Sequence, residues 1–161
     1  MSTYTLKGFS HFPFFLLKGL VSDLSDEVGT VIKAALMKDA WTPDQDNDTV
    51  FSDISEHEIT GDPVLDPDGH YTAGGLILAG LVAGASVSLS GRVTTVDFDD
   101  GTLDNVTIGA YKLAIYDATE GDPDDQVLIA FCDFGGLKAS NSGTYKIVLH
   151  PSGLFTITVP A

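Results

Sequence analysis

The chain has 161 residues, with 23 Asp and Glu against 8 Lys and Arg and a formal net charge of −15. A chain of this length buries about 70% of the surface that its unfolded form exposes, so we expect one core and a single domain, residues 1–161. A hydrophobic content of 43% argues against disorder, which needs low hydrophobicity together with high charge. Because an acidic surface repels phosphate backbones and anionic lipids, we expect no nucleic-acid partner and no membrane partner.

The acidic side chains are concentrated in a few segments. Residues 1–42 contain four basic and four acidic side chains and are neutral, whereas residues 43–70 contain nine acidic side chains and no Lys or Arg. Most of the other acidic side chains fall in residues 97–104 and 117–125. We expect these acidic loops to face solvent.

The apolar stretches of the chain are too short or too interrupted for membrane insertion. Residues 12–17 lie after a lysine, but Pro13 and Lys18 interrupt them, which argues against a signal peptide. The longest uncharged apolar stretch, residues 73–85, falls short of the roughly 20 residues that span a bilayer. The one cysteine, Cys132, follows an apolar run and is predicted to be a buried thiol, which fits assembly in a reducing compartment.

The N-terminal segment, residues 1–28, contains the one predicted helix. Ser10 is a candidate N-cap, and Pro13 suits the first turn of a helix. Apolar side chains recur at spacings of three and four on one helix face: Phe9, Phe12, Leu16 and Leu20. Gly19 and the polar residues 22–27 are predicted to end the helix. Two interpretations of the apolar face stay open, packing on the edge of the core and contact with a partner.

Residues 29–161 are predicted to form the β core. Strand candidates with alternating or apolar patterns are residues 30–37, 76–82, 86–89, 92–98, 106–108, 110–116, 126–134, 145–149 and 154–159. Turn-forming residues separate them, as in Gly135-Gly136 and Asn141-Ser142-Gly143. Short strands that recur about every ten residues, without helical segments between them, predict a mainly β fold. We expect an antiparallel β-sandwich or jelly-roll-like domain with one N-terminal helix.

No motif in the chain has the residue spacing of a metal or cofactor site. Residues 44–48 place three carboxylates at alternate positions, but a calcium-binding EF-hand loop would need Gly and Glu where the chain has Thr49 and Ser55. A solvated loop and a weak cation site both remain open for this segment. The four histidines are far apart and lack the partners that a zinc site needs. We expect no metal ligands and no cofactor.

Catalytic motifs are also missing. Ser52, Ser55 and His57 lie near Asp53, but no strand, serine and helix elbow surrounds them. The glycine pairs lack the lysine and the following helix of a phosphate-binding loop. We therefore predict no catalytic residues and a protein that is not an enzyme.

A succession of short motifs covers most of the chain: Leu16-Leu17-x-Gly19, Val31-Ile32-Lys33-Ala34-Ala35-Leu36, Trp41-Thr42-Pro43, Phe51-Ser52-Asp53-Ile54-Ser55, Glu58-Ile59-x-Gly61, Tyr71-Thr72-Ala73-Gly74-Gly75, Ala114-Ile115-Tyr116, Leu128-Ile129-Ala130-Phe131 and Asp133-Phe134-Gly135-Gly136. In this order they resemble small virion structural proteins of tailed bacteriophages, most closely a capsid decoration (cement) protein. In that pattern the Glu-Ile motif runs almost directly into the Tyr-Thr-Ala-Gly-Gly motif. Residues 62–70 are therefore an apparent loop insertion in this chain.

The resemblance implies a non-enzymatic protein on the capsid surface of the virion, assembled in the host cytoplasm. The implied partners are the major capsid protein and further copies of the chain, in a homo-oligomer such as a trimer. Many modest contacts would then hold the shell through avidity. The alternative is a tail, neck or fibre-associated virion protein with a host-surface or adaptor role, and a glycan-cleaving virion enzyme is the third class.

Five side chains are the predicted interface residues. In the N-terminal segment these are Phe12, Phe15 and Leu16, which we expect to dock on a partner. Trp41 and Tyr71 stand at junctions of loops and strands, where aromatic side chains either fill the core or anchor an interface. Deletion of residues 1–20 is expected to weaken association with the particle and to leave the β domain folded.

Overall fold

A computed structural model describes residues 4–20, 29–79, 85–90, 93–149 and 155–158. The prediction of a mainly β, antiparallel fold with one short N-terminal helix is confirmed. The helix is α1 (Phe12–Leu17), and two 3-10 turns are η1 (Phe51–Asp53) and η2 (Ser55–His57). The strands are β1 (Lys7–Gly8), β2 (Ile32–Met37), β3 (Leu76–Ala79), β4 (Ala85–Ser90), β5 (Val93–Phe98), β6 (Gly101–Asp117), β7 (Leu128–Ile147) and β8 (Phe155–Thr158). One sheet has the order β1-β7-β6-β2-β3 and the other has the order β4-β5-β8.

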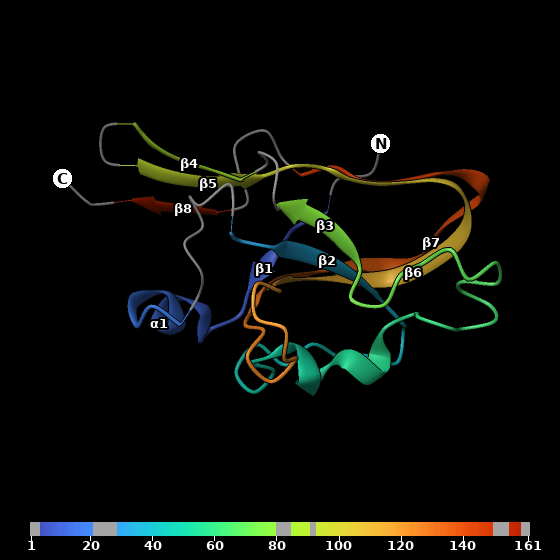
Figure 1. Cartoon of the computed structure of the whole chain (residues 1–161), viewed down its shortest axis with the longest axis horizontal. Helices are drawn as coiled ribbons and strands as arrows, with labels where there is room; N and C mark the ends of the chain where they lie inside the picture. The colour runs from blue at the N-terminus through green and yellow to red at the C-terminus, as the bar shows by residue number, and fades with distance from the viewer. Residues whose placement is uncertain (1–3, 21–28, 80–84, 91–92, 150–154, 159–161) are drawn as a thin grey trace.

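The long antiparallel pair of β6 and β7 links the two sheets. These strands have 17 and 20 residues and pair along nearly their whole length. In the chain β5 directly precedes β6 and β8 follows β7, and β5 pairs with β8 as well. Figure 1 shows β6 and β7 curving out of the five-stranded sheet and over toward the side of the three-stranded sheet. The two long segments therefore run together from one sheet into the other.

The continuity of β6 and β7 corrects the predicted strand boundaries. Residues 106–108 and 110–116 belong to one strand, and the predicted turns Gly135-Gly136 and Asn141-Ser142-Gly143 lie inside β7. Backbone with positive φ occurs at Gly135, Gly136 and Ser142, and the pairing of β6 with β7 shifts register at four places. A paired neighbour satisfies the flanking backbone groups, so an irregular residue bends the strand without ending it.

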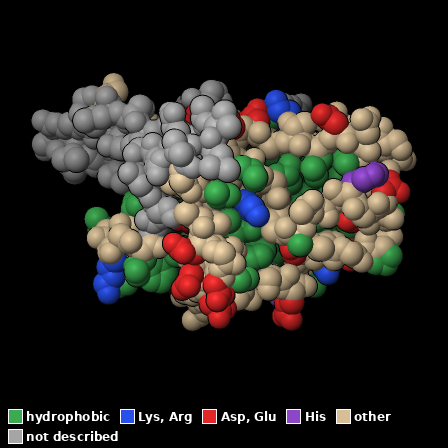
Figure 2. Space-filling view, viewed as in Figure 1, with side chains coloured by type: hydrophobic (Ala, Val, Ile, Leu, Met, Phe, Trp, Pro, Cys, Tyr) green, Lys and Arg blue, Asp and Glu red, His purple; other side chains and the backbone are tan. Residues whose placement is uncertain are grey.

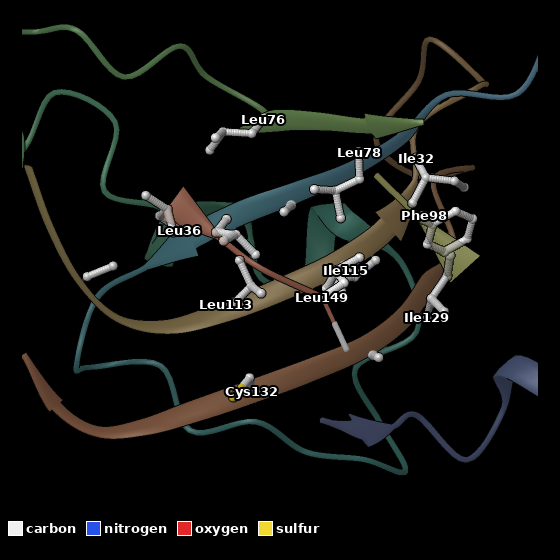
Figure 3. Packing of buried hydrophobic residues seen from close by; sticks show 14 of the residues in the cluster. Ile32, Leu36, Leu76, Leu78, Phe98, Leu113, Ile115, Ile129, Cys132 and Leu149 are labelled. Carbon is white, nitrogen blue, oxygen red and sulfur yellow. The ribbon is translucent and has the colours of Figure 1, made fainter. Parts of the chain in front are cut away.

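The larger hydrophobic core joins side chains from both sheets. In Figure 3 side chains of β2, β3, β6 and β7 meet Phe98 of β5 and Leu149, which follows β7. Cys132 of β7 is buried in this core, as predicted, and burial raises the pKa of its thiol to about 11. Contact between layers thus comes from apolar side chains that alternate along each strand.

A second core lies on the opposite face of the five-stranded sheet. Ala35 and Met37 of β2 contribute to it, whereas their neighbour Leu36 belongs to the larger core. Residues 38–57 cover this face with side chains that include Trp41 and Phe51, and Figure 1 shows the segment with η1 and η2 lying along the sheet. The centre of the sheet is therefore buried on both faces.

The N-terminal segment is an integral part of the fold. Strand β1 pairs with β7 at the sheet edge, while Phe9 and Phe12 are buried in the second and the larger core, respectively. Deletion of residues 1–20 would remove this strand and both side chains. The structure therefore argues against the expectation that the rest of the domain folds normally without them.

The ends of α1 agree only in part with the predicted signals. Ser10 does not cap the helix, because its Oγ donates to the carbonyl oxygen of Gln45 at 2.9 Å. Gly19 ends the helix as predicted, with φ +68°, and the N–H groups of Gly19 and Leu20 donate to the carbonyl oxygens of Leu16 and Phe15. This is the hydrogen-bond pattern of a glycine helix end.

The close approach of Gly75 to β2 makes a testable prediction about stability. Gly75 has φ +83°, and a Cβ there would overlap the carbonyl group of Ala34 and lie 2.8 Å from the Cα of Ala35. We expect Gly75→Ala to lower the free energy of unfolding by at least about 2 kcal/mol, because both strain and overlap act against it. Urea unfolding followed by circular dichroism measures this change.

The control for this prediction is Gly121→Ala. A Cβ at Gly121 has open space around it, and its φ is not in the left-handed region. The control should stay within about 0.5 kcal/mol of the wild type. Equal unfolding midpoints for the two variants would contradict the packing of Gly75 against β2.

Candidate functional site

A buried polar cluster connects residues 58–75 to the five-stranded sheet. The Oε1 of Glu58 accepts hydrogen bonds from the Tyr71 hydroxyl at 2.7 Å and from the Gly74 N–H at 2.8 Å. The Tyr71 hydroxyl in turn accepts from the Leu36 N–H of β2 at 2.8 Å. From β6, the Tyr116 hydroxyl donates to the carbonyl oxygen of Gly74 at 2.6 Å. We call Glu58, Tyr71, Gly74 and Tyr116 the polar clamp.

The electrostatics of the polar clamp follow from its burial. Burial raises the pKa of Glu58 above its usual range, although hydrogen bonds from Tyr71 and Gly74 and the positive charge of Lys33 oppose the shift. Burial and the nearby Glu58 charge also raise the pKa values of Tyr71 and Tyr116. Both hydroxyls therefore keep their protons at neutral pH and use them in hydrogen bonds that hold the fold together. The geometry indicates a structural role for the clamp.

Three of the five predicted interface residues are buried inside the chain. Tyr71 belongs to the polar clamp, Phe12 lies in the larger core, and Trp41 lies in the second core. The Trp41 Nε1 donates to the Asp48 carboxylate at 3.2 Å, and its ring meets the ring of Phe131 edge-on. The structure therefore places Trp41 and Tyr71 in the core, which is one of the two roles that their positions at loop junctions allowed.

The other two predicted residues, Phe15 and Leu16, are half-buried, and different residues of α1 face solvent. Phe14 is 55% exposed, Leu17 is 89% exposed, and Leu20 just beyond the helix is 57% exposed. The Lys18 Nζ lies 4.7 Å from the centroid of the Phe14 ring, within the range of a cation–π contact. Figure 2 shows hydrophobic side chains beside a basic one over α1. We call Phe14, Leu17, Lys18 and Leu20 the α1 face.

Sequence patterns do not single out the α1 face. Residues 12–17 contain apolar side chains at almost every position, so more than one side of the helix satisfies a spacing of three and four. The buried side is decided by Phe9 and Phe12, which enter the two cores. A prediction of the exposed side would need the position of β1 against β7, which depends on a pairing across more than a hundred residues.

The acidic loop of residues 44–48 uses its carboxylates locally. The Asp44 carboxylate accepts from the backbone N–H groups of Asp46 and Asn47 and from the side-chain amide of Asn47, which holds the Asp44 pKa below its usual range. The Asp48 carboxylate accepts from Trp41 and from the Asp44 N–H. In the described part of the chain, no group of three or more His, Cys, Asp or Glu side chains is arranged to hold a metal ion.

Asp53 and the neighbouring Ser55 also have structural partners. The Asp53 carboxylate accepts from the N–H groups of Thr49 and Val50 and from the Thr49 hydroxyl. The Ser55 hydroxyl donates to the carbonyl oxygen of Ser52. The contacts of Asp53 and Ser55 thus stabilise the turns η1 and η2.

The helices of the described residues include none with the length and apolar character of a membrane span.

Comparisons with known proteins identify no relative of this chain. No family model matches it, and neither a curated protein nor a solved structure is significantly similar to it. A proposal about function therefore depends on the geometry of the chain and on the resemblance carried by its motifs.

The raised pKa of Glu58 predicts how stability depends on pH. For an acid whose pKa is raised by folding, the stabilising contribution is complete below the ordinary pKa of 4.5 and is lost as pH rises through the higher folded value. Glu58→Gln keeps an oxygen that accepts from Tyr71 and Gly74 but does not ionise. We expect the wild type to lose stability relative to Glu58→Gln as pH rises from 4.5 toward neutral, measured by urea unfolding at a series of pH values.

Tyr71→Phe is the comparison for this measurement. It removes the hydroxyl that pairs the Leu36 N–H with Glu58, so it leaves buried polar groups without their partner at every pH. We expect a loss of about 1–3 kcal/mol that persists across the whole pH series. Parallel pH profiles for the wild type and Glu58→Gln would contradict the raised pKa of Glu58.

Proposed function

We propose that this chain is a non-enzymatic virion structural protein of a tailed bacteriophage, of the kind that decorates and stabilises the outer capsid surface as an oligomer. The α1 face carries the proposal, because it presents Phe14 and Leu17 to solvent on the least acidic part of a strongly acidic chain. Proposed partners are the major capsid protein and further copies of the chain. The proposed location is the virion, after assembly in the host cytoplasm.

The charge and exposure of the α1 face support a docking role. Residues 4–20 contain Lys7 and Lys18 and no Asp or Glu, whereas the chain as a whole has a net charge of −15. Burial of an exposed side chain such as Leu17 contributes about 1.5–3 kcal/mol. When many copies bind one particle, such modest contacts add up to stable attachment. The acidic surface elsewhere would keep decorated particles soluble and apart.

The polar clamp supports the resemblance at the level of the fold. The Glu58-Ile59-x-Gly61 and Tyr71-Thr72-Ala73-Gly74-Gly75 motifs supply Glu58, Tyr71 and Gly74 of the clamp, and Gly75 packs against β2. These residues fasten residues 58–75 to the five-stranded sheet, so their recurrence in a family would follow from a shared architecture. As the finer fold class we propose a β-sandwich or jelly-roll-like domain, consistent with two sheets that share a core and are linked by β6 and β7.

Association with particles tests the proposed function. A double variant, Phe14→Ser with Leu17→Ser, removes the two exposed apolar side chains of the α1 face. The matched control is Ile77→Ser on β3, because Ile77 is an apolar side chain that is 60% exposed. Loss of two buried side chains predicts at least about a tenfold decrease in protein that co-sediments with capsids lacking it, because 1.4 kcal/mol corresponds to a factor of ten. The control should bind like the wild type.

Copy number separates the head from the tail. Quantitative mass spectrometry of purified virions should find hundreds of copies per particle if the protein decorates the capsid. A dozen copies or fewer would contradict decoration and favour a tail, neck or fibre position. Failure of the wild type to associate with any particle would contradict the virion role itself.

A further inference from the structure

We propose that the α1 face of one copy docks on the opposite end of a second copy, at an apolar and acidic surface formed by residues 61–70 and the neighbouring part of β7. The inference rests on the proposed function, since it names the partner of the same docking face. It adds a contact between different surfaces of identical chains. Figure 1 shows α1 and the loop of residues 61–70 toward opposite ends of the long axis of the molecule.

The acceptor surface is built around Gly109 of β6. The Gly109 N–H donates to the carbonyl oxygen of Leu65 at 2.8 Å. A Cβ on Gly109 would lie 2.9 Å from a methyl carbon of Leu137 and 3.6 Å from one of Leu65, so the loop and β7 meet at this point. Next to Leu65, Val64 is 81% exposed, and Leu137 is 49% exposed. The exposed side chains of Val64 and Leu137 therefore lie on the two segments that meet at Gly109.

Hydrogen bonds hold Val64 in this exposed position. The Asp62 carboxylate accepts from the N–H groups of Val64 and Leu65, which fixes the turn. Residues 61–70 contain three acidic side chains and no Lys or Arg. Lys38 is close enough to Asp62 to lower its pKa, but the loop keeps a net negative charge. We call Val64, Leu137 and Asp62 the acceptor patch.

Charge complementarity argues for a second copy as the occupant of this contact. Two chains that each carry −15 repel each other unless their approach pairs unlike charges. The α1 face joins apolar side chains to Lys18, whereas the acceptor patch joins apolar side chains to Asp62. Contact between two α1 faces would instead bring two copies of Lys18 together.

A contact between different surfaces of identical chains has a consequence for assembly. Such a heterologous contact leaves one free α1 face and one free acceptor patch on every open oligomer. Successive copies therefore add in one direction, and the oligomer closes into a ring when the rotation per copy allows it.

Sedimentation equilibrium of the full chain without particles tests the inference. The wild type should associate with increasing concentration. Leu17→Asp places a carboxylate in the α1 face, and Val64→Asp places one in the acceptor patch. Each variant alone should raise the dissociation constant at least tenfold, while Ile77→Ser should leave it unchanged. Circular dichroism checks that all variants stay folded.

Mixing the two variants distinguishes this contact from the other arrangements. Leu17→Asp retains an intact acceptor patch and Val64→Asp retains an intact α1 face, so an equal mixture should form a species of twice the monomer mass and none larger. A contact between two α1 faces would leave Val64→Asp fully associated on its own, and that result would overturn the inference.

The particle measurement keeps the inference and the proposed function separate. If the wild type stays monomeric at all concentrations, the second copy is not the partner and the inference fails. If the monomeric protein still needs Phe14 and Leu17 to bind capsids, the capsid occupies the α1 face and the proposed function stands. If the protein self-associates as expected but binds no particle, the inference stands without the virion role.

Discussion

The contact of Gly75 with β2 is the constraint on which the arrangement of this molecule depends. The backbone of Gly75 lies so close to Ala34 that no side chain fits between them. The polar clamp holds the same segment through Tyr71 and Glu58, whose oxygens also satisfy backbone groups at Leu36 and Gly74. Together these contacts fasten residues 58–75 to the five-stranded sheet. The fastened segment in turn places Ile59, Leu65 and Tyr71 in the larger core.

The second core, in turn, explains why the N-terminal segment exposes the α1 face. Phe9 enters the second core and Phe12 enters the larger core. The sides of the segment that carry Phe9 and Phe12 therefore face inward. Phe14 and Leu17 then have no place inside the chain. A stable exposed apolar surface of this kind arises because the inward positions are already filled, and it provides binding energy for a partner. The charge of the segment makes it the part of the chain that an acidic partner repels least.

Sequence patterns located most of the strands but not their continuity. Alternation of apolar and polar side chains indicates that a strand exists, and the loop between β6 and β7 was recognisable from its acidic, turn-forming residues. Gly135-Gly136 and Asn141-Ser142-Gly143 have the composition of turns, because these residue types readily adopt positive φ. Their place inside β7 depends on β6, which supplies hydrogen bonds from residues distant in the chain. The sequence also leaves the burial of Trp41 and Tyr71 undecided, because aromatic side chains at loop junctions suit a core and an interface equally well.

The sequence by itself determined the mainly β, antiparallel character of this protein and the burial of Cys132. These properties follow from local alternation, apolar runs and turn chemistry, which act over a few neighbouring residues. Only the tertiary structure decided that Glu58 and Tyr71 form a polar clamp, that β6 and β7 run unbroken between the sheets, and that Phe14 and Leu17 face solvent. The physical reason is that burial and hydrogen-bond pairing depend on contacts between residues far apart in the chain, and no local pattern records those contacts.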